Sequence, residues 1–195
     1  KEYNGQGIVF IKPWENDDII NKIKLAEESN AIAVGVDIDA CGLVTLSMHG
    51  KKVVPKTVED LRKLKNSTKL PFIVKGIMAV EAGVDAIVIS NHGGRVLDCT
   101  PGVCEVIPAI AKAVKGKITI LADGGVRTGV DVVKMIGLGA DAVLIGRPFV
   151  TASFGGKTDG VKTYVENIKN ELKSTMILTG CQSIKDIDSK VIYNY

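Results

Sequence analysis

The segment SNHGGR, residues 90–95, combines a histidine, two glycines and an arginine directly after an apolar run. A neutral imidazole accepts protons near physiological pH, so His92 is a candidate general base. The forked guanidinium group of Arg95 can bind a carboxylate through two hydrogen bonds. The segment therefore predicts an acid–base site for an anionic substrate. His49, the other histidine of the chain, has no such neighbours and is interpreted as structural.

Charged residues end two further apolar runs: Lys75 ends PFIVK, and Asp37 ends AIAVGVD. An unpaired ammonium group at the end of a buried strand is costly, so Lys75 needs an anionic partner. That partner is either a bound ligand or one of the carboxylates of Asp37 and Asp123. Asp37 is also placed to orient His92 and stabilise its protonated form. Asp39 is the alternative candidate for this role, because VDID contains two aspartates.

Two later loops pair glycine with arginine: DGGVRTG, residues 123–129, and IGRP, residues 145–148. Each follows an apolar run and opens a helical pattern, so its backbone N–H groups can point at an anion. The glycines permit close backbone approach, and the arginines add forked positive charge. The residues concerned are Gly124, Gly125, Arg127, Gly146 and Arg147. Together the loops predict a phosphate site; the alternative is that these glycines only form turns and these arginines only cover the surface.

Six short apolar runs, most of them uninterrupted, predict parallel strands buried on both faces. They cover residues 8–11, 31–36, 71–74, 86–89, 118–121 and 142–145. Amphipathic helical patterns lie between them, with Ile19, Ile23 and Ala26 on one face of the first and Val58, Leu61 and Leu64 on one face of the second. Thr57 with Asp60, and Thr128 with Asp131, predict capping boxes, and Gly139 predicts a helix end.

A repeat indicates how these elements are arranged. Residues 83–90 read GVDAIVIS and residues 139–146 read GADAVLIG, and each copy follows a strand that ends at a glycine. This repeated strand–helix unit predicts an α/β fold of the (β/α)8 or TIM barrel type, in a single domain over residues 1–195. A full barrel has eight strands, so two would have to precede Lys1. The link from Gly76 to Gly83 is too short for an ordinary crossover helix, so either one helix is missing, which is the preferred interpretation, or the local connection is unusual.

Composition excludes several classes of protein. Of the 195 residues, 46% are hydrophobic and 24% charged, which argues against disorder and collagen-like structure. The net charge of +3 is too small to indicate nucleic acid as a partner. The four cysteines lack metal-site spacing, so no metal is expected. The chain contains no signal-peptide pattern and no membrane-length apolar run, and a cytoplasmic location without membrane partners is expected.

The motifs KGI, DAIVISNHGGRVLD and ILADGGVRTGVDVVKMIGLGADAVLIGRPF together resemble the FMN-dependent 2-hydroxy-acid dehydrogenase and oxidase family, which includes glycolate and lactate oxidases. The resemblance runs from about Pro71 to Ile192. It implies an FMN-binding barrel that oxidises a small 2-hydroxy acid, of the lactate or glycolate type, to the 2-oxo acid. The electron acceptor is not implied. Relatives are often tetramers, so a homo-oligomer is expected.

The resemblance also implies roles for individual residues. His92 matches the catalytic base, Asp37 the carboxylate that supports it, and Arg95 an arginine that binds the substrate carboxylate. The cofactor contacts implied are Lys75 beside the N1–O2 edge of the flavin, Ser90 against its ring, Asp123 on the ribityl hydroxyls, and Gly125, Arg127, Gly146 and Arg147 around the phosphate.

The chain departs from the family pattern at three places. Phe10 and Lys12 stand in the strand that usually carries Gln and Tyr, and Gly35 replaces a Thr. The second substrate arginine, expected after Asp37, has no match. Two alternatives therefore accompany the main interpretation. One is a flavin-dependent isomerase of the isopentenyl diphosphate type, which resembles the chain in its DGG and IGR loops. The other is a phosphate-binding barrel without redox function.

Overall fold

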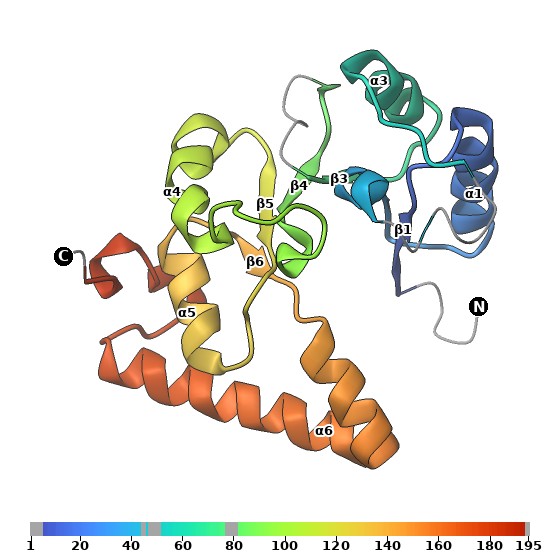
Figure 1. The fold of residues 1–195 in the computed structure, drawn as a ribbon. Helices are drawn as coiled ribbons and strands as arrows, with labels where there is room; N and C mark the ends of the chain where they lie inside the picture. The colour runs from blue at the N-terminus through green and yellow to red at the C-terminus, as the bar shows by residue number, and fades with distance from the viewer. Residues whose placement is uncertain (1–5, 44–45, 47–51, 77–81, 194–195) are drawn as a thin grey trace. The chain divides into compact units, whose positions relative to one another are not determined.

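The computed structural model describes residues 6–43, 46, 52–76 and 82–193, and the chain divides into two compact units (Figure 1). The first unit comprises Lys1–Thr100 and Gly116–Thr119, and the second comprises Pro101–Lys115 and Ile120–Tyr195. Parallel strands alternate with helices in both units, which confirms the predicted α/β class. The single barrel domain expected from the sequence stays a prediction.

Four parallel strands form the sheet of the first unit in the order in which they occur along the chain. They are β1 (Ile8–Ile11), β2 (Ala33–Asp37), β3 (Phe72–Lys75) and β4 (Ala86–Ile89). Nearly every residue of β2, β3 and β4 is buried, as their uninterrupted apolar sequences predict, whereas the first two residues of β1 are exposed.

Two α-helices of this unit bury most of the residues that their periodicity predicts, whereas Val58 at the start of α3 is only partly buried. Helix α1 (Asn16–Glu28) buries Ile19, Ile23 and Ala26, and helix α3 (Val58–Asn66) buries Leu61 and Leu64. A 3₁₀ turn, η1 (Ile38–Gly42), follows β2, and another, η3 (His92–Gly94), follows β4. The predicted capping box begins α3, because Thr57 accepts from the N–H of Asp60 while Asp60 accepts from the N–H of Thr57.

The second unit has the same alternation of elements. It contains α4 (Val103–Val114), β5 (Thr119–Ala122), α5 (Gly129–Gly137), β6 (Ala142–Val143) and α6 (Arg147–Leu178), followed by the 3₁₀ turns η4 (Ile184–Asp186) and η5 (Ser189–Val191). Strands β5 and β6 pair in parallel. The second predicted capping box, Thr128 with Asp131, begins α5. Val133, Cys181 and Ile187 form a buried core that connects α5 to the C-terminal turns.

Helix α6 is bent at Lys157, where φ is 49° and ψ is −136°. Figure 1 shows the two helical segments meeting at an angle there. The second segment packs closely against the start of α5, since a Cβ atom on Gly129 would lie 2.1 Å from the backbone nitrogen of Leu172. Gly129 is therefore required by close helix packing, a role that its place in the DGGVRTG motif did not reveal.

Strand boundaries differ from the predicted ones where neighbouring elements use the backbone. The predicted strand at 31–36 starts later, at Ala33, because the N–H of Ala31 donates to the carbonyl of Ala26 at the end of α1. It also extends to Asp37, which pairs with Lys75 on β3. The predicted strand at 142–145 is shorter, at 142–143, although the N–H of Leu144 still donates to Ala122 of β5.

Two predictions lie outside the described residues. The shortened connection between Gly76 and Gly83 includes residues 77–81, and His49 lies in the segment 47–51. The missing crossover helix and the structural role of His49 therefore stay predictions. Within the described ranges, no helix combines the length and apolar character that crossing a membrane requires.

Candidate active site

The carboxyl ends of the first unit's strands bring the predicted acid–base residues together. Asp37 is the last residue of β2 and lies beside Lys75, the last residue of β3. Ser90 directly follows β4, and η1 and η3 carry Asp39 and His92. All parallel strands end at the same edge of a sheet, so these five side chains meet although they are far apart in sequence.

Lys75 lies at the centre of this cluster and contacts its other members. Its Nζ lies 3.2 Å from Oδ1 of Asp37, 3.0 Å from Oδ2 of Asp39 and 2.9 Å from Oγ of Ser90. The Lys75 side chain is only 13% exposed, so these contacts compensate for the burial of its charge. Pairing with Asp37 was one of the predicted possibilities for Lys75, and the structure adds Asp39 as a second carboxylate partner.

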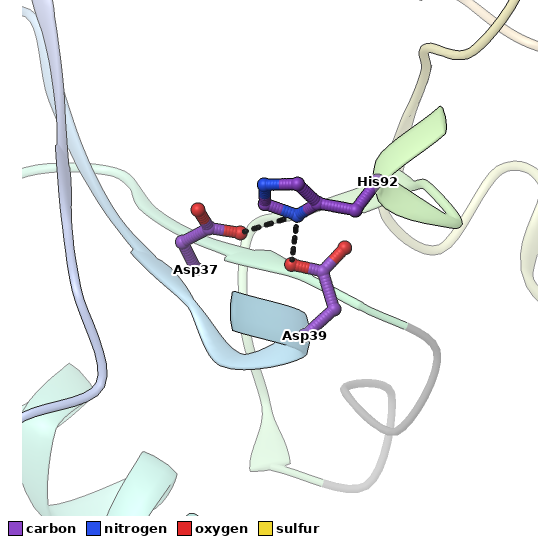
Figure 2. A group of neighbouring side chains, drawn as sticks. All are labelled: Asp37, Asp39 and His92. Atoms are coloured by element: carbon purple, nitrogen blue, oxygen red, sulfur yellow. Dashed lines mark hydrogen bonds and ion pairs between the residues drawn. The ribbon is translucent and has the colours of Figure 1, made fainter. Parts of the chain in front are cut away.

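The imidazole ring of His92 turns its Nδ1 toward both aspartates (Figure 2). Nδ1 lies 3.1 Å from Oδ1 of Asp39 and 3.9 Å from Oδ1 of Asp37. Asp39, the alternative candidate in the sequence, is thus the carboxyl group at hydrogen-bonding distance, whereas Asp37, the preferred candidate, is too distant for a direct hydrogen bond. The reason is local: η1 turns the chain directly after β2 and carries Asp39 to the imidazole.

The backbone of the SNHGGR segment holds His92 in an uncommon conformation. His92, Gly93 and Gly94 have φ values of 55°, 67° and 73°, and the two glycines accept this left-handed region at little cost. Ser90 Oγ accepts a hydrogen bond from the N–H of His92 at 3.0 Å. The Nε of Arg95 donates to the carbonyl of His92 at 3.0 Å. This bond keeps the exposed Arg95 near the imidazole, as a partner for a substrate carboxylate requires.

The surroundings of the two aspartates shift their pKa values in opposite directions. Burial raises the pKa of Asp39 to about 7, and the neighbouring carboxylate of Asp37 raises it further. Burial acts in the same direction on Asp37, but the neighbouring Asp39 carboxyl group and the ammonium groups of Lys12 and Lys75 hold its pKa well below the usual value. Burial and the positive charge of Lys75 lower the pKa of His92. These surroundings therefore favour the neutral ring, the form in which an imidazole can act as a base.

Lys12 joins the cluster from the end of β1, and the sequence analysis assigned it no role. Its Nζ lies 2.5 Å from Oδ2 of Asp37, while its side chain keeps 33% exposure. The pattern that singled out Lys75, a lysine at the end of an apolar strand, would also have singled out Lys12. Phe10 of β1 lies opposite Gly35 of β2, and its ring occupies the space that a side chain at Gly35 would need, because a Cβ atom on Gly35 would lie 2.6 Å from the ring.

Asp37, Asp39 and His92 also have the composition of a metal site, since one ligand atom of each lies within 4.8 Å of the others. However, the Lys75 ammonium group lies 3.2 Å, 3.0 Å and 3.3 Å from the three residues. Lys75 already supplies a positive charge at this position, so the arrangement indicates acid–base chemistry.

The two glycine–arginine loops lie wholly in the second unit and follow its neighbouring strands, β5 and β6. Gly124 and Gly125 have φ values of 91° and 84°. A Cβ atom on Gly125 or Gly146 would meet no other atom within 4 Å, so the space beside both glycines is open. The guanidinium groups of Arg127 and Arg147 are on exposed residues. Open glycine turns with two exposed cations suit an anion such as a phosphate.

Several backbone N–H groups of the DGGVRTG loop are already hydrogen-bonded to side chains of the protein and are not available to an anion, contrary to the prediction. The N–H groups of Arg127 and Thr128 donate to Oδ2 of Asp131, each at 3.0 Å, and the N–H of Gly129 donates to Glu171 at 2.8 Å. The capping box therefore uses amides that the sequence analysis had offered to an anion. The Gly124–Gly125 turn and the arginine side chains are left for that purpose.

With this geometry established, comparison with known proteins identifies the family. The sequence profile of the FMN-dependent dehydrogenases matches residues 14–194. The chain belongs to the FMN-dependent dehydrogenase family. It is 49% identical over 136 residues to a peroxisomal (S)-2-hydroxyacid oxidase of Arabidopsis thaliana, an alignment that covers 66% of this chain and 38% of that protein. It is also 49% identical over 138 residues to an L-lactate dehydrogenase of Pectobacterium atrosepticum, with coverage of 67% and 36%.

Solved structures of the family agree with the predicted fold. The chain matches a crystal structure of mandelate oxidase with a TM-score of 0.85 and 31% identity, over 94% of this chain and 63% of that one. The FMN-dependent dehydrogenase chain thus forms part of a TIM barrel, as the sequence analysis predicted. It spans less than two fifths of the length of the two curated relatives.

The residues present fit FMN. The open glycine turns and exposed arginines of the second unit have the chemistry of a phosphate site, and Lys75 with Ser90 supplies a cation and a hydroxyl group in the first. Asp123 directly follows β5, as predicted for a group that binds the ribityl hydroxyls. These individual cofactor contacts stay predictions.

Proposed function

We propose that the protein containing this chain oxidises a small 2-hydroxy acid, of the lactate or glycolate type, to the corresponding 2-oxo acid with FMN as its cofactor. The observation that carries this proposal is the partly buried cluster of His92, Asp39 and Lys75 beside Arg95. It combines a neutral base with a cation that suits a carboxylate. The family match supports this chemistry over the flavin-dependent isomerase and the non-redox barrel.

When FMN is bound, it would accept the two electrons that leave the substrate. Gly125, Arg127, Gly146 and Arg147, with Gly124, would hold its phosphate, and Asp123 its ribityl hydroxyl groups. Lys75 and Ser90 would contact its ring. The Lys75 ammonium group favours negative charge nearby, so it would stabilise the anionic form of the reduced ring.

His92 is the proposed base. Its Nδ1 faces the aspartates, which leaves Nε2 as the nitrogen that accepts a proton from the substrate. The carboxylate of Asp39, 3.1 Å from Nδ1, offsets the positive charge that the proton taken up by Nε2 brings to the pair. Asp37, which lies at 3.9 Å, stabilises it through space.

Arg95 is the proposed partner of the substrate carboxylate. Its hydrogen bond to the His92 carbonyl anchors the guanidinium group through Nε, so the terminal nitrogens can form a two-pronged contact with a carboxylate. The bond to the His92 carbonyl also keeps the Arg95 guanidinium group close to the base. A substrate whose carboxylate is bonded to its hydroxyl-bearing carbon could therefore reach Arg95 and His92 together.

The absorption spectrum of the purified full-length protein tests the proposal. We expect the bands of bound oxidised flavin, and we expect anaerobic lactate or glycolate to bleach them. A protein with bound flavin that no 2-hydroxy acid bleaches would favour an isomerase. A protein that binds no flavin would favour the non-redox barrel.

Two further expectations stay predictions. A homo-oligomer is expected from the family resemblance, and the location is expected to be cytoplasmic. The Arabidopsis relative carries a peroxisomal name, so fractionation of cells that produce the protein is the measurement that decides its location.

A further inference from the structure

The two aspartates beside His92 have unequal surroundings. Asp37 has a lysine on each carboxylate oxygen: Lys12 lies 2.5 Å from Oδ2, and Lys75 lies 3.2 Å from Oδ1. Among the described residues, the lysine paired with Asp39 is Lys75, which Asp39 shares with Asp37. Lys12 ion-pairs with Asp37 and not with Asp39 in the described part of the chain. Of the two carboxyl groups, Asp37 is therefore the better stabilised anion.

An anion at Asp37 makes it costly for Asp39 to ionise as well. Two carboxyl groups in one buried site rarely carry two negative charges, and the less stabilised one retains a proton. Asp39 is that group, and its Oδ1 lies 3.1 Å from Nδ1 of His92. The Lys75 ammonium group, 3.3 Å from the same nitrogen, disfavours a second positive charge on the ring. A proton between Asp39 and His92 is thus better placed on the carboxyl group.

We propose that Asp39 and His92 titrate as one unit whose extra proton resides on Asp39, and that Lys12 is the positioning residue that creates this arrangement by keeping Asp37 ionised. The inference rests on the proposed role of His92 as the base. It adds a residue, Lys12, that the acid–base pair itself does not contain.

The unit of Asp39 and His92 has two protonation states that differ by one proton. In the protonated unit, the Asp39 hydroxyl group donates to Nδ1 of His92, and the ring proton is on Nε2, which is then no base. When the unit loses one proton, Nε2–H releases it to solvent and the Asp39 proton passes to Nδ1. The result is a carboxylate that accepts from Nδ1–H and an Nε2 that can accept a proton from the substrate. The base is available only above the pH of this transition.

Among the described residues, charged groups on several elements surround this unit: Lys12 after β1, Asp37 of β2, Lys75 of β3 and Arg95 in the segment after β4. The titratable thiol of Cys41 on η1 also lies near the two aspartates, and burial raises its pKa. Removal of a positive charge should raise the pH of the transition, because cations favour the deprotonated unit. Removal of the negative charge of Asp37 should lower it.

Nitrogen NMR of the FMN-loaded full-length protein, labelled with ¹⁵N-histidine, tests the inference. The His92 signals are those that disappear in His92→Gln. As the pH is lowered through the transition, we expect them to change from the neutral Nδ1–H form to the neutral Nε2–H form. A direct change to the imidazolium form, with both nitrogens protonated, would overturn the assignment of the proton to Asp39.

Variants of the ion pair test the part played by Lys12. Asp37→Asn should move the transition down by about one pH unit, and Lys12→Met should move it up by less. Lys12→Arg retains the charge and should restore the original position, and Lys24→Met, on the exposed side of α1, is the matched control. A transition that does not move in Lys12→Met, or that moves the same way in Lys12→Met and Asp37→Asn, would exclude the role of Lys12.

The measurement separates this inference from the proposed function, because NMR needs no turnover. If the change between ring forms occurs but no 2-hydroxy acid bleaches the flavin, only the proposed function fails. If 2-hydroxy acids bleach the flavin while His92 titrates directly to imidazolium, the function stands and the inference fails.

Discussion

At the scale of single residues, His92 combines an uncommon backbone conformation with a fixed side chain. A φ of 55° is unfavourable for a residue with a Cβ atom, so the surrounding contacts must hold it in place. The hydroxyl group of Ser90 holds the backbone N–H, and Asp39 holds the ring. This preorganisation is typical of a residue that must present one ring nitrogen to a substrate.

We therefore predict that His92→Gln leaves FMN binding intact but slows flavin reduction by 2-hydroxy acids roughly 10²–10⁴-fold. Glutamine keeps hydrogen-bonding groups but cannot serve as the base. Anaerobic stopped-flow absorbance of the full-length protein measures the rate, with His49→Gln as the control. An unchanged rate of reduction in His92→Gln would remove His92 from the chemistry.

Lys75→Met is predicted to slow flavin reduction more than it weakens FMN binding. The change removes the cation shared by Asp37 and Asp39, and with it the charge that favours an anionic reduced flavin. Equilibrium titration with FMN and the stopped-flow rate give the two quantities, and Lys24→Met is again the control. A variant that loses FMN but retains its reduction rate would show the opposite arrangement.

At the scale of elements, helix starts and strand ends position the site. The Thr57–Asp60 capping box begins α3, and its Asp60 carboxylate also accepts a hydrogen bond from Asn16 of α1 at 2.7 Å. The backbone and side-chain hydrogen bonds from Thr57, with that from Asn16, lower the pKa of Asp60 to about 2. Asp60 thus connects the starts of two helices, and α1 begins four residues after Lys12, which itself follows β1.

Thr57→Ala is predicted to lower the free energy of unfolding by about 1 kcal/mol, the usual effect of losing such a cap. Asp60→Asn should also destabilise. Because the pKa of Asp60 is lower in the folded state, its contribution is fully present above pH 4 or so and is lost as the pH falls toward 2.

Urea unfolding of the full-length protein at pH 7 and at lower pH measures both effects. The exposed Lys63→Ala, on the same helix, is the control and should change stability by less than about 0.5 kcal/mol. If the destabilisation by Asp60→Asn were independent of pH down to about 2, its carboxylate charge would not be the cause.

At the scale of the whole molecule, the acid–base cluster belongs to the first unit and the glycine–arginine loops belong to the second. The proposed function needs both, since FMN has a ring to be reduced and a phosphate to be held. Under the proposed function, the first unit supplies the acid–base residues and the second unit supplies the loops that would hold the phosphate.

The double variant Arg127→Ala with Arg147→Ala is predicted to weaken FMN binding by roughly a hundredfold or more. It removes two charge-assisted contacts, each worth about 1.5–3 kcal/mol. Fluorescence titration of the full-length protein with FMN measures the change, and Arg62→Ala on α3 controls for lost surface charge. Undiminished affinity in the double variant would refute the phosphate assignment.

Much of the fold and most of the candidate residues could be predicted from local sequence. Apolar runs, most of them uninterrupted, identified all six strands of the described residues, and helical periodicity identified the buried faces of α1 and α3. Strand-end charges identified Lys75, and the SNHGGR segment identified His92. These succeed because burial, capping and turn conformation depend on neighbouring residues along the chain.

Only the tertiary structure decided which of these residues act on one another. Asp39 rather than Asp37 meets the imidazole because η1 turns the chain after β2, and Lys12 reaches Asp37 because β1 pairs with β2 in a register that aligns their ends. Strand register and the direction of a turn set these distances, and neither is written in residue type or spacing. The charged residues of the site can therefore be predicted from the sequence. Which of them pair with one another depends on the fold, and the pairing in turn decides which carboxyl group holds a proton.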